Sequence, residues 1–486
     1  MRILKFILTL LIGFTIFLQF SCKDKGPNTG SDVMVTFSSD TLTFDTVFVT
    51  FGSTTKFFKI KNPTNSLIQL SSVRLLNNSP NNNFRINVDG VPGNATDVPI
   101  LPRDSIYVFV EVTVDPTAGN LPFIIEDQVE VVVNGNVQTV QLNAWGQNAY
   151  FHYRETINSE TWLSDKPHVV VGGFDSASQA FHPGIIVNGN LNINAGAEVY
   201  MYNNSALFVN ENASITAIGT ASSPIQFEGV RLESFFDGLP GQWLGIFIFR
   251  SSTGNILEHV RIDESTFGIN LGVIDTCDLT TATNNTRPDI TMNQVIIRNS
   301  FNNALFSFNS RVRANNCLFY NSVEELVALG LGGDYQFNQC TFNNGGSVVV
   351  NHNAPNILLS NFAEGCGQFV VGSLDEATFT NCINYGSLDE ELSINRDSLG
   401  TFNFLFDHCL LKTELDTTEP EYQNILLNQN PLFEGPSVDS FQLMPGSPAI
   451  DYGTSSFPGG VIIDRDLYGG SRPQGGGYDL GAIESQ

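Results

Sequence analysis

The sequence predicts an all-β protein, with a β-sandwich in its first third followed by a parallel β-helix. Two observations carry this prediction. A short motif recurs about every 22 residues between residues 256 and 412, and short strands separated by turn residues fill the segment before residue 149. Neither part shows apolar residues at the period of an amphipathic helix.

The recurring motif centres on an apolar residue or a cysteine that follows a corner rich in asparagine. Its seven centres are Val260, Val295, Cys317, Cys340, Phe362, Cys382 and Cys409. Apolar and polar residues alternate around most centres, and two mostly polar residues interrupt the alternation, so two short strands meet at a corner. Asparagine suits such corners because it tolerates left-handed backbone and stacks its amide along the axis. Stacked coils of this length are typical of a parallel β-helix.

Cysteines occupy the same inward position in four of these coils: Cys317, Cys340, Cys382 and Cys409. Parallel stacked Cβ vectors poorly match the torsion angle that a disulfide requires. No C-x-x-C pair accompanies these residues, which argues against a metal site. We therefore expect free thiols that fill a narrow core.

The segment 32–149 has a different pattern, with short runs rich in β-branched and aromatic residues. The expected strands cover residues 33–37, 46–51, 56–60, 106–112, 128–133 and 137–142. Turn residues such as Asn62-Pro63, Asp89-Gly90 and Asn134-Gly135 separate the runs. The number and length of the strands suit an immunoglobulin-like β-sandwich.

The amino terminus predicts export. Arg2 and Lys5 precede an apolar run over residues 6–20, which is typical of a signal peptide. Phe20-Ser21-Cys22 resembles a bacterial lipobox, and the resemblance implies cleavage before Cys22 and lipidation of its thiol. A plain secretory signal with a chance cysteine is the alternative. The polar, breaker-rich stretch after Cys22 is expected to act as a tether.

The charge balance limits the classes of partner. The chain carries 49 acidic and 23 basic residues, which argues against nucleic acid and anionic membrane surfaces. Neutral, cationic or calcium-bridged partners are favoured. No apolar run after residue 21 has the length of a membrane span, so we expect a body attached to the outer membrane by lipid alone, at the cell surface.

These observations give a domain plan: signal peptide 1–21, lipidated tether 22–31, immunoglobulin-like sandwich 32–149, linker 150–166, parallel β-helix 167–429 and C-terminal segment 430–486. The C-terminal segment is expected to cap the last coil, whose strand edges would otherwise stay unpaired.

Several stretches resemble known families. Residues 58–63 together with 101–108 resemble the Hydin and major-sperm-protein-like branch of the immunoglobulin fold. Residues 184–193 and 240–246 resemble exported right-handed β-helix proteins of the pectate-lyase-like superfamily. The whole arrangement resembles an uncharacterised class of bacterial surface lipoproteins. The resemblance implies a right-handed β-helix; because that class has no assigned catalytic residues, none can be transferred to this chain.

Outward positions beside the motif centres give a candidate ligand face: Arg261, Asp263, Arg298, Tyr320, Tyr385 and Lys412. Aromatic rings stack on sugar faces, and arginine or lysine pairs with the carboxylates of uronic acids. Basic residues are scattered along the repeats, and carboxylate pairs fall mainly in loops, so we assign no catalytic residue. Two hypotheses remain open for Asp464 and Asp466: calcium binding, or bracing of the C-terminal segment through Arg465 or Arg472.

We expect a surface lipoprotein with a non-catalytic β-helix face that recognises a glycan or a surface protein, and no cofactor. The alternative is a carbohydrate-active enzyme, either a polysaccharide lyase or a glycoside hydrolase, on the same β-helix. A structural role in a surface layer is a third hypothesis. Charged residues from at least three coils that meet on one face would favour the enzymes.

Overall fold

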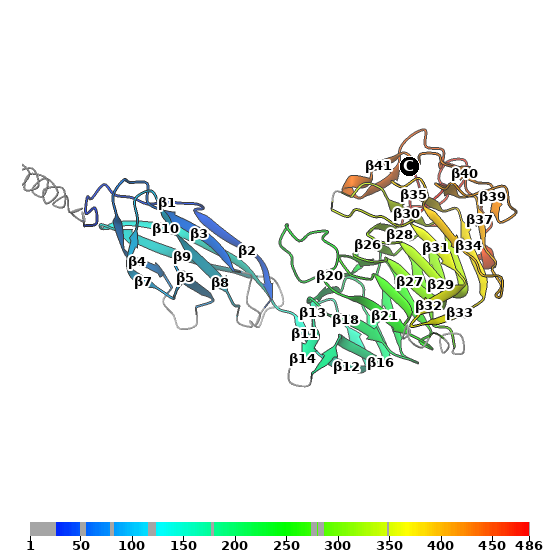
Figure 1. The fold of residues 1–486 in the computed structure, drawn as a ribbon, viewed down its shortest axis with the longest axis horizontal. Helices are drawn as coiled ribbons and strands as arrows, with labels where there is room; N and C mark the ends of the chain where they lie inside the picture. The colour runs from blue at the N-terminus through cyan, green and yellow to red at the C-terminus, as the bar shows by residue number, and fades with distance from the viewer. Residues whose placement is uncertain are drawn as a thin grey trace, which may run out of the picture. The chain divides into compact units, whose positions relative to one another are not determined.

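The computed structural model describes residues 26–48, 55–77, 82–114, 123–175, 179–273, 279, 286–347 and 349–485. Cys22 and the expected signal peptide lie outside these residues. Within them the chain is all-β, and its few helical turns include the 3₁₀ helices η2 (Pro436–Val438) and η3 (Pro458–Gly460). None of the described residues forms a helix long and apolar enough for a membrane span. The chain divides into two compact units at Asn148 and Ala149, each described by itself (Figure 1).

The first unit contains two five-stranded sheets. One has the order β1 (Thr36–Phe37), β3 (Lys56–Lys61), β8 (Ser105–Val112), β5 (Phe84–Val88) and β6 (Val91–Pro92). The other has the order β2 (Thr41–Phe48), β10 (Asn136–Gln147), β9 (Phe123–Val133), β4 (Ile68–Leu75) and β7 (Ala95–Ile100). Pairing is antiparallel except between β2 and β10.

Alternation of apolar and polar residues gives each sheet of the first unit one buried face. In β8, Ile106, Val108 and Val110 are buried, whereas Tyr107 and Phe109 between them are exposed. Buried aromatic rings connect the two sheets, because the centroid of Phe44 in β2 lies 5.9 Å from that of Phe84 in β5. The two buried faces therefore share a core.

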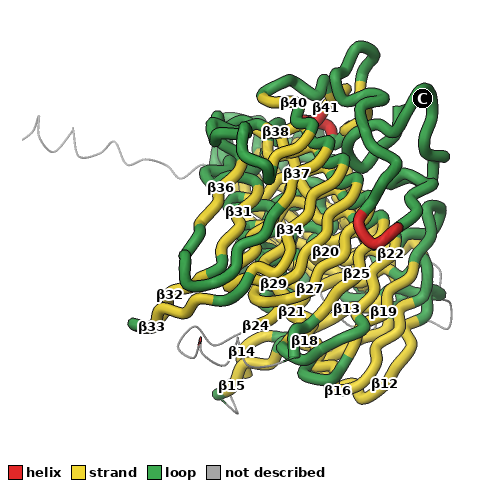
Figure 2. Tube along the Cα trace, turned by 90° about the vertical axis from the view of Figure 1, so that its right-hand side faces the viewer, coloured by secondary structure: helices red, strands yellow, loops and turns green. Residues whose placement is uncertain are grey.

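Two long parallel sheets form most of the second unit (Figures 1 and 2). The eleven-stranded sheet consists of β11 (Tyr150–Tyr153), β13 (His168–Val171), β17 (Glu198–Met201), β20 (Ile225–Gly229), β23 (Val260–Ile262), β26 (Ile296–Ser300), β28 (Leu318–Ser322), β30 (Thr341–Asn344), β35 (Ile383–Gly386), β38 (Leu410–Leu411) and β40 (Leu426–Leu427).

The fifteen-stranded sheet consists of β12 (Glu155–Trp162), β16 (Gly184–Ile193), β18 (Ala206–Val209), β19 (Ser214–Ile218), β21 (Gly245–Phe249), β22 (Asn255–Glu258), β24 (Ile269–Val273), β25 (Asp289–Asn293), β27 (Leu305–Asn315), β29 (Val327–Asn338), β31 (Ile357–Ser360), β34 (Leu374–Thr380), β36 (Leu392–Asn395), β37 (Leu405–Asp407) and β39 (Tyr422–Gln423). Three antiparallel pairs complete the unit: β14 (Gly173–Asp175) with β15 (Ala180–His182), β32 (Phe362–Gly365) with β33 (Gln368–Val371), and β41 (Phe433–Gly435) with β42 (Ser440–Leu443).

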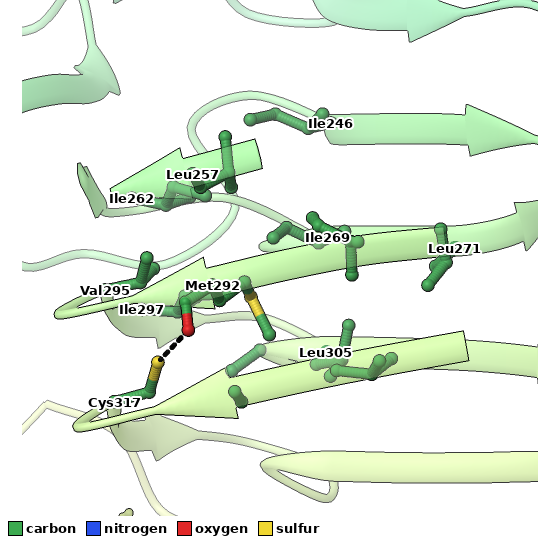
Figure 3. Packing of buried hydrophobic residues seen from close by; sticks show 14 of the residues in the cluster. Ile246, Leu257, Ile262, Ile269, Leu271, Met292, Val295, Ile297, Leu305 and Cys317 are labelled. Carbon is green, nitrogen blue, oxygen red and sulfur yellow. Dashed lines mark hydrogen bonds between the residues drawn. The ribbon is translucent and has the colours of Figure 1, made fainter. Parts of the chain in front are cut away.

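The core of the second unit is a continuous stack of inward side chains (Figure 3). The four ladder cysteines are buried in it and free, which confirms the prediction for these thiols. The Sγ of Cys317 lies 3.6 Å from the carbonyl oxygen of Met292, as the dashed line in Figure 3 marks. The rings of Phe337, Phe379 and Phe406 stack with centroid distances of 4.9 and 4.6 Å. One apolar interior therefore runs between the two sheets.

Asparagine side chains at the corners stack along the axis, as the sequence predicts. The Nδ2 of Asn315 donates to the Oδ1 of Asn293 at 2.9 Å, and the Nδ2 of Asn338 donates to the Oδ1 of Asn315 at 3.0 Å. These amides form a ladder from coil to coil. Neighbouring corner residues such as Asn316 and Asn381 have φ of 50° and 55°, a left-handed backbone that asparagine tolerates better than most residues.

Phe362 does not occupy the inward position that the repeat predicted, so that assignment is wrong. In the eleven-stranded sheet Thr341 pairs directly with Ile383, and no strand lies between them. Phe362 instead begins the hairpin β32–β33, where it is half-buried and its ring centroid lies 5.4 Å from that of Phe369. The tight turn between the strands, with φ of 46° at Cys366 and 76° at Gly367, lets the chain pair locally.

The segment 150–166, expected as a linker, is instead part of the second unit. Its strands β11 and β12 pair in parallel with β13 and β16. The segment looks polar because β12 is an edge strand with mostly exposed side chains. Only Ile157 and Trp162 of this strand are buried. These two side chains pack against the core beside β16.

The C-terminal segment lies along the outer face of the eleven-stranded sheet, and its contacts are not confined to the last coil. Leu318, Ile383 and Leu410 on that face form a buried cluster with Phe441 and Leu480 of the segment. Hydrogen bonds extend over the same strands: the Nδ2 of Asn316 donates to Arg465 O, and Ala482 N donates to the Oγ1 of Thr341. The segment thus shields outward apolar residues that the repeat leaves exposed.

Candidate ligand-binding face

Strand register brings most predicted face residues into one row on the eleven-stranded sheet. Tyr200 pairs with Glu228, Arg298 pairs with Tyr320, and Tyr320 and Tyr385 are joined through Asn343. Asp263 directly follows β23, and Lys412 directly follows β38, so they continue the alternation of their strands. We call this set the outer row: Tyr200, Glu228, Asp263, Arg298, Tyr320, Asn343, Tyr385 and Lys412.

Buried Asp263 and partly exposed Arg298 form an ion pair in the middle of the row. The Nε of Arg298 lies 2.5 Å from the Oδ2 of Asp263, and the Nδ2 of Asn299 donates to the Oδ1 at 2.8 Å. Asp263 is 6% exposed. Burial raises the pKa of the Asp263 carboxyl, while Arg298 and Asn299 act in the opposite direction. Both oxygens of this carboxylate therefore accept hydrogen bonds from side chains of the protein itself.

Tyr320 and the remaining donors of Arg298 face the C-terminal segment. The Nη1 of Arg298 donates to the Oη of Tyr320 at 3.0 Å and to the Oδ2 of Asp439 at 2.5 Å. The ring of Phe441 covers Tyr320 with centroids 4.8 Å apart, and Tyr320 is only 3% exposed. Burial raises the pKa of Tyr320 above its usual range. These residues hold the C-terminal segment and are closed to a large ligand.

At the C-terminal end of the row, Tyr385 and Lys412 also have partners within the protein. The Nζ of Lys412 lies 5.1 Å from the centroid of Tyr385 and donates to the carbonyl oxygen of Gly386 at 2.9 Å. Arg261 is exposed and lies two residues before Asp263, in the neighbouring outward row that pairs it with Gln226 and Ile296, beside Leu467 and Tyr468. The structure thus brings Asp263, Arg298, Tyr320, Tyr385 and Lys412 together and leaves Arg261 apart.

Asp464 and Asp466 do not meet as a pair of metal ligands. Asp464 is exposed, whereas Asp466 is buried. The Oδ1 of Asp466 accepts hydrogen bonds from the backbone amides of Tyr468 at 3.0 Å and Gly470 at 2.6 Å, and its Oδ2 accepts one from Glu484 N at 3.3 Å. Asp466 therefore braces the C-terminal segment through backbone amides. The described residues contain no cluster of three or more acidic, histidine or cysteine side chains that could hold a metal ion.

The outer row begins next to carboxylates at Tyr200 and Glu228, a grouping that the sequence repeat does not predict. Tyr200 and Glu228 are half-buried, and the Tyr200 hydroxyl lies 3.4 Å from the Oε2 of exposed Glu198. Burial, followed by repulsion from Asp263 and Glu198, raises the pKa of Glu228 to about 7. We call Glu198, Tyr200 and Glu228 the acidic end. Glu198 and Tyr200 lie two residues apart in β17, and the register of β17 on β20 places Glu228 beside Tyr200.

A loop over residues 230–242 flanks the acidic end. Glu264 fixes the loop, because its Oε1 accepts from Gly238 N at 2.8 Å and its Oε2 from Gly229 N at 3.2 Å. Burial and the charge of Asp263 raise the pKa of Glu264 to about 8. The guanidinium of Arg231 lies 3.8 Å from the ring centroid of Phe236 on this loop. The loop thus adds an aromatic and a cationic group beside the carboxylates.

No family model and no curated protein matches the sequence. Among solved structures, parts of the chain resemble a family 123 glycoside hydrolase from Clostridium perfringens, studied for glycolipid glycan hydrolysis, at 11% identity and a TM-score of 0.19 over 27% of this chain and 31% of that chain. The PapD-like domain 7 of human CEP192 is similar at 12% identity and a TM-score of 0.17, over 27% of this chain and 95% of that one.

A protein of unknown function from Porphyromonas gingivalis W83 is similar at 12% identity and a TM-score of 0.17, over 26% of this chain and 59% of that one. The chain spans less than a third of the hydrolase's length. Likenesses this weak do not identify a function. The class is set by the fold itself, an all-β protein with large parallel sheets.

Proposed function

We propose that this protein is an exported surface lipoprotein in which an immunoglobulin-like sandwich precedes a right-handed parallel β-helix. Two facing five-stranded sheets in the first unit and stacked parallel strands in the second support these folds. Cys366 is disulfide-bonded, which fits an oxidising compartment outside the cytoplasm. The signal-like sequence and Cys22 support lipid anchoring at the outer membrane.

A labelling experiment tests the anchor. Cells grown with a palmitate analogue should label the full chain, and Cys22→Ala should abolish the label. Protease treatment of intact cells should then remove the anchored protein from the surface. Equal labelling of the variant would exclude Cys22 as the attachment site, and complete protection from protease would exclude surface exposure.

The function that the geometry supports best is binding of a neutral glycan at the acidic end. The observation that carries it is the grouping of Glu198 and Tyr200 of β17 with Glu228 of the adjacent strand β20. A ring can stack on a sugar face while carboxylates accept from sugar hydroxyls. Arg298 and Lys412 already donate within the protein, which disfavours a uronate ligand and lyase chemistry at this row.

One observation favours glycoside hydrolysis as a second candidate. Glu228 and Glu198 both lie near the Tyr200 hydroxyl, and burial raises the pKa of Glu228 to about 7. A carboxyl that stays protonated near neutral pH can act as a general acid, with a second carboxylate as base or nucleophile. On this proposal Glu228 is the acid and Glu198 its partner.

Calorimetry of the full chain against neutral oligosaccharides of cellulose, xylan and mannan tests both candidates. Tyr200→Ala, which removes the stacking ring, and Glu228→Gln should each weaken binding, whereas the exposed controls Tyr153→Ala and Glu160→Gln should not. Release of reducing sugar that Glu228→Gln abolishes would establish the hydrolase. Absence of binding to all these sugars, or unchanged binding by Glu228→Gln, would refute the neutral-glycan site.

A further inference from the structure

The first unit exposes an aromatic surface that its own core does not use. Phe57 of β3 is 51% exposed, and Tyr107 and Phe109 of β8 are 37% and 38% exposed. Strand register places Phe57 opposite Phe109. The ring centroids of Phe57 and Tyr107 are 5.2 Å apart, and those of Tyr107 and Phe109 are 5.8 Å apart with 11° between the planes. We call Phe57, Tyr107 and Phe109 the aromatic platform.

Cationic side chains surround the platform on the same outward face. Lys59 pairs in register with Tyr107, and its Nζ lies 4.6 Å from the centroid of that ring. Lys61 and Arg85 occupy outward positions of β3 and β5 and are exposed. Among the described residues, no ion pair engages these three cations. Glu111 lies opposite Arg85 in register and also faces outward, so the three cations outnumber this acidic neighbour in a chain whose net charge is −26.

A pocket adjoins the platform. It has a volume of about 700 Å³, and its lining includes Phe109 from the platform and Arg85 from the surrounding cations. Asn87, Asn94 and Glu111 add polar groups to the same lining. Phe57 is tilted by 58° to both other rings, so the platform is a group of neighbouring rings of which only Tyr107 and Phe109 are nearly parallel. This group, the flanking cations and the pocket are continuous through Phe109 and Arg85.

We propose that this face binds an anionic polysaccharide, in which sugar rings stack on the aromatic platform and carboxylates or sulfates pair with Lys59, Lys61 and Arg85. Stacking on an exposed ring is favourable for the apolar face of a sugar, and opposite charge attracts the chain to the site. This site is separate from the acidic end and does not rest on the function proposed there. The first unit would then recognise an anionic glycan and the second a neutral one.

The size of the surface favours a polysaccharide over a folded protein. Three partly exposed rings offer far less than the ~800 Å² per partner that a standard protein interface buries. Protein interfaces also exclude charges from their centre, whereas the Nζ of Lys59 lies over a platform ring. A narrow linear ligand that alternates apolar faces with charged groups fits this arrangement.

Affinity electrophoresis of the full chain in gels containing polygalacturonate or alginate tests the proposal, with dextran as the neutral polymer. Wild type should be retarded by at least one anionic polymer, and added salt should weaken the retardation. Tyr107→Ala with Phe109→Ala should weaken binding about tenfold or more. Lys59→Gln with Lys61→Gln and Arg85→Gln should weaken it at least as much and remove its salt dependence.

Matched controls lie on the other sheet of the same unit. Ile124→Ala with Val137→Ala removes two exposed apolar side chains, at 64% and 58% exposure, and should leave binding unchanged. Arg74→Gln removes a cation that pairs with Glu130 and should also leave it unchanged. Absence of retardation by both anionic polymers would overturn the proposal. So would undiminished binding by the variant that lacks the rings or by the variant that lacks the cations. Loss of binding in Glu228→Gln would also overturn it, because that result would assign the site to the second unit.

Discussion

Arg298 donates a hydrogen bond from Nη1 to the Oδ2 of Asp439, a residue 141 positions further along the chain. The same guanidinium donates from Nε to the Oδ2 of Asp263 on the preceding coil. Opposing the effect of burial, Asp263, Tyr320 and Asp439 raise the pKa of Arg298, so this side chain stays charged. Arg298 thus joins two neighbouring strands of the sheet to the C-terminal segment. The middle of the outer row therefore holds that segment in place.

The two carboxylate partners of Arg298 should differ in their effect on stability. Arg298→Ala leaves Asp263 buried without its cation and should lower the free energy of unfolding by about 3–5 kcal/mol. Asp439→Asn breaks a partly exposed contact and should cost about 0.2–1 kcal/mol. Urea unfolding followed by tryptophan fluorescence measures both, because the indole N–H of Trp243 donates to Asp263 O. Equal costs would show that the ion pair with Asp263 is not effectively buried.

Phenylalanine substitutions test the corrected register of the repeat. Phe379 is fully buried between Phe337 and Phe406, so Phe379→Ala should destabilise the protein by about 3–5 kcal/mol. Phe362→Ala removes a half-buried ring from a hairpin and should cost less than about 1.5 kcal/mol. Urea midpoints of the two variants give the comparison. A loss at Phe362 as large as that at Phe379 would place Phe362 in the core.

The repeat predicted the inward positions well because their chemistry is uniform. Cys317, Cys340 and Cys382 follow corner residues at a constant distance, and all three are buried. Phe362 matches the same pattern, and alternation alone could not separate it from them. The difference is the turn at Cys366, whose positive φ allows a local hairpin, and a spacing pattern does not report backbone conformation.

The candidate face was predictable only where the repeat is regular. Counting outward from the motif centres places Arg298, Tyr320 and Tyr385 in one row, as the register shows. Asp439 belongs to a segment without a repeat, so its contact with Arg298 could not be predicted from the spacing of residues along the chain. Glu228 precedes the first motif centre, and its approach to the row depends on a register that the motif does not cover.

Glu228→Gln should stabilise the protein at high pH. The pKa of this carboxyl is raised from 4.5 to about 7 in the fold, so the folded state binds the proton more tightly than the unfolded state. Stability from this group is complete below pH 4.5 and is lost as the pH rises through 7. After allowance for partial exposure, the variant should gain about 1–3 kcal/mol at pH 8 relative to pH 5. Urea unfolding at both values measures it, with Glu160→Gln as the exposed control.

The same substitution should weaken glycan binding, so stability and function should change in opposite directions. An unchanged or lower stability of Glu228→Gln at pH 8 would show that Glu228 is not strained by its neighbours. That result would also remove the argument for Glu228 as a general acid.

His168 should make the protein less stable in mild acid. Its Nε2 donates to Leu163 O at 2.8 Å, so its Nδ1 accepts from the Nε2 of His152 at 2.9 Å and the ring is neutral. Burial is the main cause that lowers its pKa from 6.5 to about 4. Between pH 6.5 and 4 the imidazole therefore becomes protonated in the unfolded state while it stays neutral in the folded state. The free energy of unfolding falls as the pH is lowered over that range.

The difference between a pKa of about 4 and 6.5 corresponds to about 3 kcal/mol lost between pH 7 and pH 4. His168→Gln has no proton to bind and should show a shallower fall, although its loss of the stack with Trp162, at 4.6 Å, should lower stability at pH 7. Urea midpoints of wild type and variant from pH 7 to pH 4 separate the two effects. Parallel curves at every pH would mean that His168 titrates equally in both states and that its burial does not control acid stability.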